Sequence, residues 1–148
     1  MRYAFYMWTC PKCNRQFITQ NMWHSCGNYS VEKFLEGKSE HAITLYQRFV
    51  ELVRRCGPVQ IAPARTRIGF QVRMIFAAVN RLSSRSLDAH VILTRRLDNP
   101  RFRRIEKLTP NCFVHHFRIE SPDELDEEVA SWLQEAYGVG TQVHLLRS

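Results

Sequence analysis

The spacing of apolar residues changes its period at Gly57-Pro58, and this change constrains the fold more than any other feature of the chain. From Ser39 to Cys56, apolar side chains recur every three or four positions, the pattern of a helix with one buried face. From residue 59 onward, apolar and polar residues alternate, which is typical of strands that cover a core with one face. The Gly-Pro pair ends the helix because proline cannot continue it.

The alternating region divides at turn residues into about five strands. The expected strands cover residues 59–62, 66–74, 86–95, 102–108 and 112–120. Residues 74–79 either continue the second strand or begin another after a bend. A closing helix follows, in which Ser121 caps, Pro122 occupies the first turn and Glu124 completes a capping box, and Gly138-Val139-Gly140 ends it. The sequence predicts an α+β domain over residues 30–148: a mostly antiparallel sheet flanked by an N-terminal and a C-terminal helix.

Residues 1–29 are predicted to form a separate zinc finger. Cys10 and Cys13 make a Cys-x-x-Cys knuckle, and His24 and Cys26 supply a second pair of ligands after ten intervening residues. Phe17 stands where an aromatic residue packs beneath the metal in fingers that open in this way. Four protein ligands leave no open position for water, so the zinc is expected to be structural. The short His-x-Cys spacing leaves the geometry of the last ligand open.

The net charge of +7 is spread unevenly along the chain. Residues 58–119 carry twelve basic and three acidic side chains, whereas residues 120–148 carry one and seven. Alternate residues of a strand lie about 6.6 Å apart, close to the ~7 Å between successive phosphates of a nucleic-acid strand. The expected polyanion-binding residues are Arg65, Arg67, Arg73, Arg95, Arg96, Arg101, Arg103 and Arg104. The competing interpretation pairs these arginines with the acidic closing helix, at Asp123, Glu124, Asp126, Glu127 and Glu128.

No set of residues argues for catalysis. His115 is expected to point away from both Cys112 and His116, because neighbours at odd spacing in a strand face opposite sides. His90 shares a strand face with Asp88, the one His–carboxylate pairing of note. There is no glycine-rich phosphate loop, and Cys56 is most simply a small core residue, as is Cys112. The chain is therefore not expected to be an enzyme.

The sequence also predicts a cytoplasmic protein that makes no membrane contact. Its longest apolar run, residues 74–79, is far shorter than a membrane helix, and polar residues interrupt the N-terminus before a signal-peptide core forms. In a reducing compartment, five cysteines fit metal ligands and free thiols better than disulfides.

The body from about Ser39 to Gly138 resembles a bacterial domain-of-unknown-function family. The residues that carry the resemblance are the helix end at 56–59, the stretch 62–70, the run 75–79 and the closing helix from Asp123 to Tyr137. The resemblance implies a small α+β domain. Such domains are sometimes attached to nuclease-like domains and sometimes labelled predicted transport proteins, and the resemblance carries no activity.

Three functions fit these observations. The leading hypothesis is a zinc-containing binding protein that engages DNA, RNA or another polyanion through its arginine-rich sheet face. The first alternative is a module for a protein partner, with the finger and the acidic helix as contact surfaces. The second is an enzyme acting on an anionic small molecule in a pocket between helix and sheet, recognisable by a cleft that gathers several of Arg65, Arg67, His90 and His116.

Overall fold

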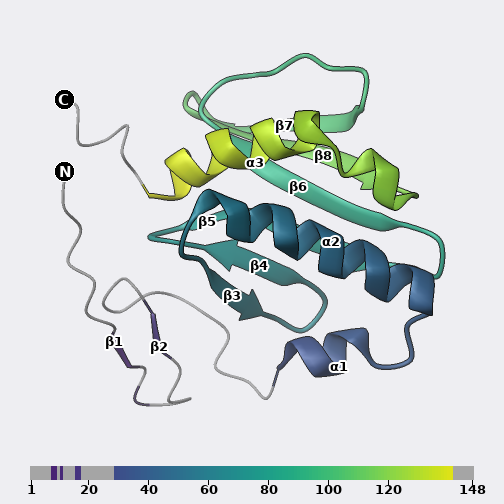
Figure 1. The fold of residues 1–148 in the computed structure, drawn as a ribbon. Helices are drawn as coiled ribbons and strands as arrows, with labels where there is room; N and C mark the ends of the chain where they lie inside the picture. Colours follow the sequence, from purple (N-terminus) through teal and green to yellow (C-terminus); the bar gives the residue numbers. More distant parts are fainter. Residues whose placement is uncertain (1–7, 10, 12–15, 18–28, 142–148) are drawn as a thin grey trace.

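The structure, a computed structural model, describes residues 8–9, 11, 16–17 and 29–141 (Figure 1). Two short strands, β1 (Trp8–Thr9) and β2 (Gln16–Phe17), pair antiparallel within the predicted zinc finger. The four predicted zinc ligands, Cys10, Cys13, His24 and Cys26, lie outside the described residues. The zinc finger therefore stays a prediction.

The body is an α+β domain built on one six-stranded antiparallel sheet. The strands are β3 (Gln60–Pro63), β4 (Ile68–Gln71), β5 (Ile75–Leu82), β6 (Leu87–Leu93), β7 (Phe102–Thr109) and β8 (Cys112–Ile119). Their order across the sheet is β3-β4-β5-β6-β8-β7, and every neighbouring pair is antiparallel. The fold class is as predicted, with one strand more than the expected five.

The sixth strand arises from a bend at residues 72–74, so the predicted strand over 66–74 is wrong past Gln71. The backbone N–H of Val72 donates to the carbonyl of Met74 at 3.2 Å, which turns the chain between β4 and β5. The amides of Arg73 and Met74 both donate to the carbonyl of Gly140, at 3.0 and 3.1 Å. Of the two alternatives left open for residues 74–79, a new strand after a bend is the one observed, and a contact with Gly140 holds the bend.

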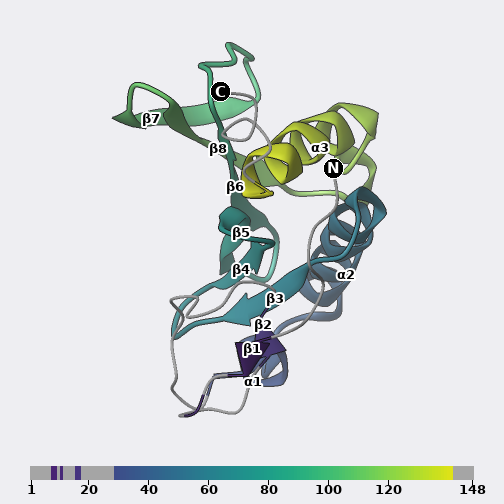
Figure 2. The same cartoon turned by 90° about the vertical axis from the view of Figure 1, so that its left-hand side faces the viewer.

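Two long helices cover one face of the sheet, as Figures 1 and 2 show. Helix α2 (Glu40–Cys56) packs Phe49 against Phe70 of β4, with ring centroids 5.6 Å apart. Helix α3 (Glu127–Gly140) packs Trp132 against Phe102 of β7, with centroids 4.4 Å apart. Among the described residues, no helix lies on the opposite face, which we call the open face of the sheet.

The helix boundaries follow their caps. The side chain of Ser39 accepts from the amide of Ala42 at the start of α2, and Gly57, with φ of 144°, ends that helix as predicted. A short helix, α1 (Val31–Leu35), precedes it. At the other end the prediction needs correction: Ser121 caps only a 3₁₀ turn, η1 (Pro122–Glu124). The cap of α3 is Asp126, whose carboxylate accepts from the amide of Val129 at 3.1 Å.

Strand alternation decides which side chains reach the open face. On β6, Leu87, Ala89, Val91 and Leu93 are buried beneath the helices, and Asp88 and His90 lie on the other side, as the sequence predicted. On β8, His115 is fully buried on the helix side, whereas His116 lies on the open face next to His90. The predicted split of the two neighbouring histidines is confirmed.

Candidate functional site

The open face carries a cavity of about 900 Å³. Its walls come from the turn before β4 and from strands β4, β5, β6, β8 and β7. Apolar side chains such as Ile75, Ile92 and Val114 form part of its lining. The polar lining residues are Arg67, Asn80, Arg81, Asp88, His90, Arg103, Arg104, Glu106, His116 and Arg118. Five arginines against two carboxylates make the cavity cationic.

Two histidines lie side by side in this cavity. His90 of β6 and His116 of β8 are direct cross-strand partners, and their rings approach edge-to-face with centroids 5.4 Å apart. His90 is the more recessed, at 7% exposure, and the side chain of His116 is 21% exposed. We call these two residues the histidine pair.

Hydrogen bonds hold both rings of the histidine pair in a definite protonation pattern. The amide nitrogen of Asn80 donates to Nδ1 of His90 at 2.8 Å, so the neutral His90 ring carries its proton on Nε2. Nε2 of His116 donates to the carboxylate of Glu106 at 2.6 Å, which leaves Nδ1 of neutral His116 without a proton. The same oxygen of Glu106 accepts from Arg104 at 3.0 Å.

The protonation of the site follows from burial and neighbouring charges. Burial, followed by the neighbouring His116 and Arg67, lowers the pKa of His90 from 6.5 to about 4, against the opposing effect of Glu106. The hydrogen bond from His116 and the charge of Arg104 lower the pKa of Glu106, although partial desolvation opposes them. At neutral pH the floor therefore holds a neutral imidazole and an ionised carboxylate.

The arginines at the rim of the cavity differ in their pairing. Arg118 makes a two-point ion pair with Asp88 across β8 and β6, at 2.6 and 3.3 Å. Within the described part of the chain, Arg67, Arg81 and Arg103 form no ion pair, and all three are exposed. Their charge remains available to an anion.

The structure brings three of the eight predicted arginines to this cavity: Arg67, Arg103 and Arg104. Arg65 is exposed in the turn between β3 and β4, and Arg73 lies in the bend after β4. The others, Arg95, Arg96 and Arg101, belong to the segment 94–101 between β6 and β7.

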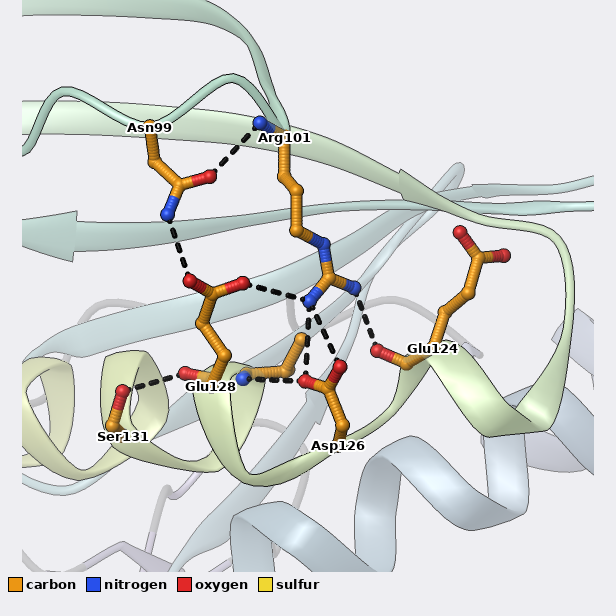
Figure 3. A network of polar contacts seen from close by, with 7 residues as sticks. Asn99, Arg101, Glu124, Asp126, Glu128 and Ser131 are labelled. Carbon is orange, nitrogen blue, oxygen red and sulfur yellow. Dashed lines mark hydrogen bonds and ion pairs between the residues drawn. The ribbon is translucent and has the colours of Figure 1, made fainter.

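Segment 94–101 uses its arginines within the molecule. Arg95 makes a two-point contact with Glu135 of α3, at 2.9 and 3.0 Å. Arg101 donates to Asp126 and Glu128 at 3.1 Å and to the backbone carbonyl of Glu124 at 2.7 Å (Figure 3). Part of the basic region is thus neutralised by the acidic C-terminal helix, as the competing interpretation expected.

Sequence reasoning missed Asn80, Arg81, Glu106 and Arg118 as parts of the site. Arg118 stands two positions after His116, so strand alternation alone places both on one face. Asn80 and Arg81 are neighbours that line the same cavity, because the strand register shifts between Val79 and Arg81. Nothing in the sequence marks that irregularity.

The cavity can be compared with the cleft that the sequence analysis expected if the protein were an enzyme for an anionic small molecule. It gathers Arg67, His90 and His116, three of the four residues named for that cleft. Its position differs from the expectation, since it lies on the open face of the sheet and not between helix and sheet. The helix side instead holds His115, which accepts from the amide of Leu97 at 2.9 Å and supports segment 94–101.

The remaining candidate groups carry no chemistry of this kind. Burial raises the pKa of the thiols of Cys56 and Cys112, which makes both poor nucleophiles. Where the structure describes the chain, no three His, Cys, Asp or Glu side chains are grouped as metal ligands. Over the same residues, none of the helices combines the length and the apolar character needed to cross a bilayer.

Fold and site together define an α+β domain in which two helices back a six-stranded sheet and the free sheet face forms a cationic hollow. Residues 31–140 match the family described as a domain of unknown function (DUF5655), and the chain belongs to that family. This confirms the resemblance to an uncharacterised domain family. No curated protein matches the chain, and no solved structure matches it either.

Proposed function

We propose that the open face of the sheet binds nucleic acid or another polyanion. The observation that carries the proposal is the cavity of about 900 Å³ whose lining holds five arginines, three of them without an ion pair to the described residues. Arginine suits this role because its planar guanidinium donates to two phosphate oxygens at once.

The dimensions of the face fit a run of phosphates. Arg67 precedes β4, and Arg103 and Arg104 lie on β7, four strand positions away. Strands lie about 4.8 Å apart, so these arginines span roughly 19 Å across the sheet. Successive phosphates on one strand lie ~7 Å apart, which places about three of them within that span.

The surface character favours this function over a protein-interaction module. In the described residues, the exposed large apolar side chains are Tyr29 and Leu108 alone, so the described surface has no extensive apolar patch for a protein partner. The acidic helix, the other surface considered for a partner, is engaged by Arg55, Arg95 and Arg101 of this chain.

A binding experiment tests the proposal. We expect a fluorescent oligonucleotide of about ten nucleotides to bind, with affinity falling steeply between about 50 mM and 200 mM salt. Arg67→Gln, Arg81→Gln and Arg103→Gln combined should lower the affinity at least tenfold. The magnitude of the salt slope should fall by about two, since each single-strand phosphate contact contributes ~0.7.

The matched control removes the same charge elsewhere. Arg48→Gln, Arg54→Gln and Arg96→Gln combined alter three exposed arginines of α2 and of segment 94–101, away from the cavity lining. This variant should keep nearly all of the affinity and the salt slope. Equal losses in the two triple variants would show that net charge alone governs binding and would refute the proposed face.

We further propose that residues 1–29 form a structural zinc module ahead of the domain at 30–148, with Cys10, Cys13, His24 and Cys26 as ligands. The support is their spacing in the sequence, together with a cysteine content suited to a cytoplasmic location. Protein refolded with zinc should retain one zinc per chain, and Cys10→Ser with Cys13→Ser should retain none. Wild-type protein without zinc would reject the module.

A further inference from the structure

We propose that the histidine pair and its arginine neighbours form a subsite for one terminal phosphate group, so that the preferred ligands are phosphomonoesters such as a 5′-phosphorylated oligonucleotide. The proposal rests on the proposed function of the open face and names the ligand class within it. Its elements are a recessed donor on His90, two flanking arginines and a carboxylate already occupied by other donors.

The recessed donor is the Nε2–H group of His90. Asn80 occupies Nδ1, and in the described part of the chain Nε2 makes no hydrogen bond. The ring lines the cavity but is only 7% exposed, so a partner for this donor must reach its floor. Nε2 of His90 is not among the enclosed side-chain atoms that lack a partner in the described residues, so a ligand oxygen can reach it.

Cationic groups stand on both sides of this donor. Arg67 lines the same cavity, and its charge is close enough to lower the pKa of His90. On the other side, Arg104 lies 3.4 Å from Nε2 of His116. Of the two carboxylates in the cavity lining, Glu106 already accepts from both His116 and Arg104, and Asp88 is paired with Arg118, so both charges are largely compensated.

A terminal phosphate fits this arrangement better than an internal phosphodiester. It has one ester link, three free oxygens and a charge of about −1.5 to −2 at neutral pH. A phosphodiester carries a single charge, has two free oxygens and is flanked by two sugars. One free oxygen can accept from Nε2–H of His90, and the other two remain for guanidinium groups that line the cavity.

Occupancy of the subsite should be coupled to proton uptake. The groups that face His90 are His116 on β8, Arg67 before β4, Asn80 on β5 and Glu106 on β7. In the free protein, burial and the charges of His116 and Arg67 keep His90 neutral. A bound dianion favours the imidazolium, so binding should tighten as the pH falls. Sulfate is a suitable probe because it stays a dianion throughout this range.

The first experiment compares the affinities of two oligonucleotides of one sequence, one with a 5′-phosphate and one with a 5′-hydroxyl. The second measures the affinity for inorganic sulfate at about pH 7.5 and pH 5.5. We expect the wild type to prefer the 5′-phosphate about tenfold. His90→Leu should abolish this preference and the pH dependence of sulfate binding. His41→Leu should change neither, since His41 is exposed on α2, hydrogen-bonded to the carbonyl of Glu120.

The outcomes separate the subsite from the proposed function. Equal affinity for the two oligonucleotides, or a preference that persists in His90→Leu, would overturn the subsite and leave polyanion binding in place. Sulfate binding that depends on His90, with neither oligonucleotide bound, would support the subsite and overturn nucleic-acid binding. Absence of all three ligands would overturn both. If His90→Leu does not fold, Asn80→Leu provides the same comparison, because it removes the bond that keeps the proton on Nε2.

Discussion

Acidification should destabilise the fold through His90 in a defined pH range. Burial, with the neighbouring His116 and Arg67, lowers the pKa of this residue in the folded protein from 6.5 to about 4. Between these values the unfolded chain binds a proton that the folded chain does not, so the free energy of unfolding falls as the pH falls. The stability that neutral His90 contributes is fully present above pH 6.5. It is lost progressively as the pH falls to about 4. At 1.36 kcal/mol for each pH unit, the loss amounts to about 3 kcal/mol.

The measurement is urea unfolding followed by tryptophan fluorescence, from about pH 7 down to pH 4, for the wild type and His90→Leu. The variant lacks the titrating ring, so the stability difference between the two proteins should shift by about 3 kcal/mol in favour of the variant on acidification. His115, whose pKa is also lowered by burial, is present in both proteins and cancels in the difference. Parallel pH profiles for the two proteins would refute the reasoning.

Two further comparisons use matched variants and the same unfolding assay. In Gly140→Ala, the new methyl group would lie 2.7 Å from Cδ1 and 3.0 Å from Cβ of Phe76, so we expect a loss of about 1–3 kcal/mol. Gly138→Ala meets nothing within 4 Å in the same helix and should be neutral or stabilising by up to about 1 kcal/mol; equal effects would contradict the packing argument. Arg101→Met should cost about 2 kcal/mol by removing a half-buried guanidinium bonded to α3. Arg96 makes one exposed ion pair, so Arg96→Met should cost less than about 1 kcal/mol. Similar costs for the two variants would contradict the stabilising role of Arg101.

The parts of the fold that depend on nearby residues could be predicted from the sequence. Helix α2 begins after Ser39 and ends at Gly57 because a hydroxyl cap and a positive φ are properties of single residues. The alternation on β6 likewise put His90 on the open face. Both are decided within a few positions along the chain, where periodicity carries the information.

What could not be predicted depends on contacts between distant residues. The bend that separates β4 from β5 is held by the carbonyl of Gly140, about seventy positions further along the chain. The irregularity before Arg81 places two successive side chains in one cavity, against strict alternation. For the same reason the grouping of arginines by sequence spacing was incomplete: Arg101 turns toward α3, and Arg118 joins the site from another strand.

The division of the arginines also explains why the open face remains cationic in a protein with an acidic C-terminal helix. Arginines of segment 94–101 form ion pairs with Asp126, Glu128 and Glu135 on the helix side of the sheet. These carboxylates therefore do not neutralise the arginines of the open face. The face keeps its own two carboxylates, each already paired, and an excess of guanidinium groups. The lowered pKa of His90, which is due first to burial and then to His116, also contains a contribution from Arg67. An anion that binds there must raise this pKa, so titration of one histidine measures both the potential of the face and its occupancy.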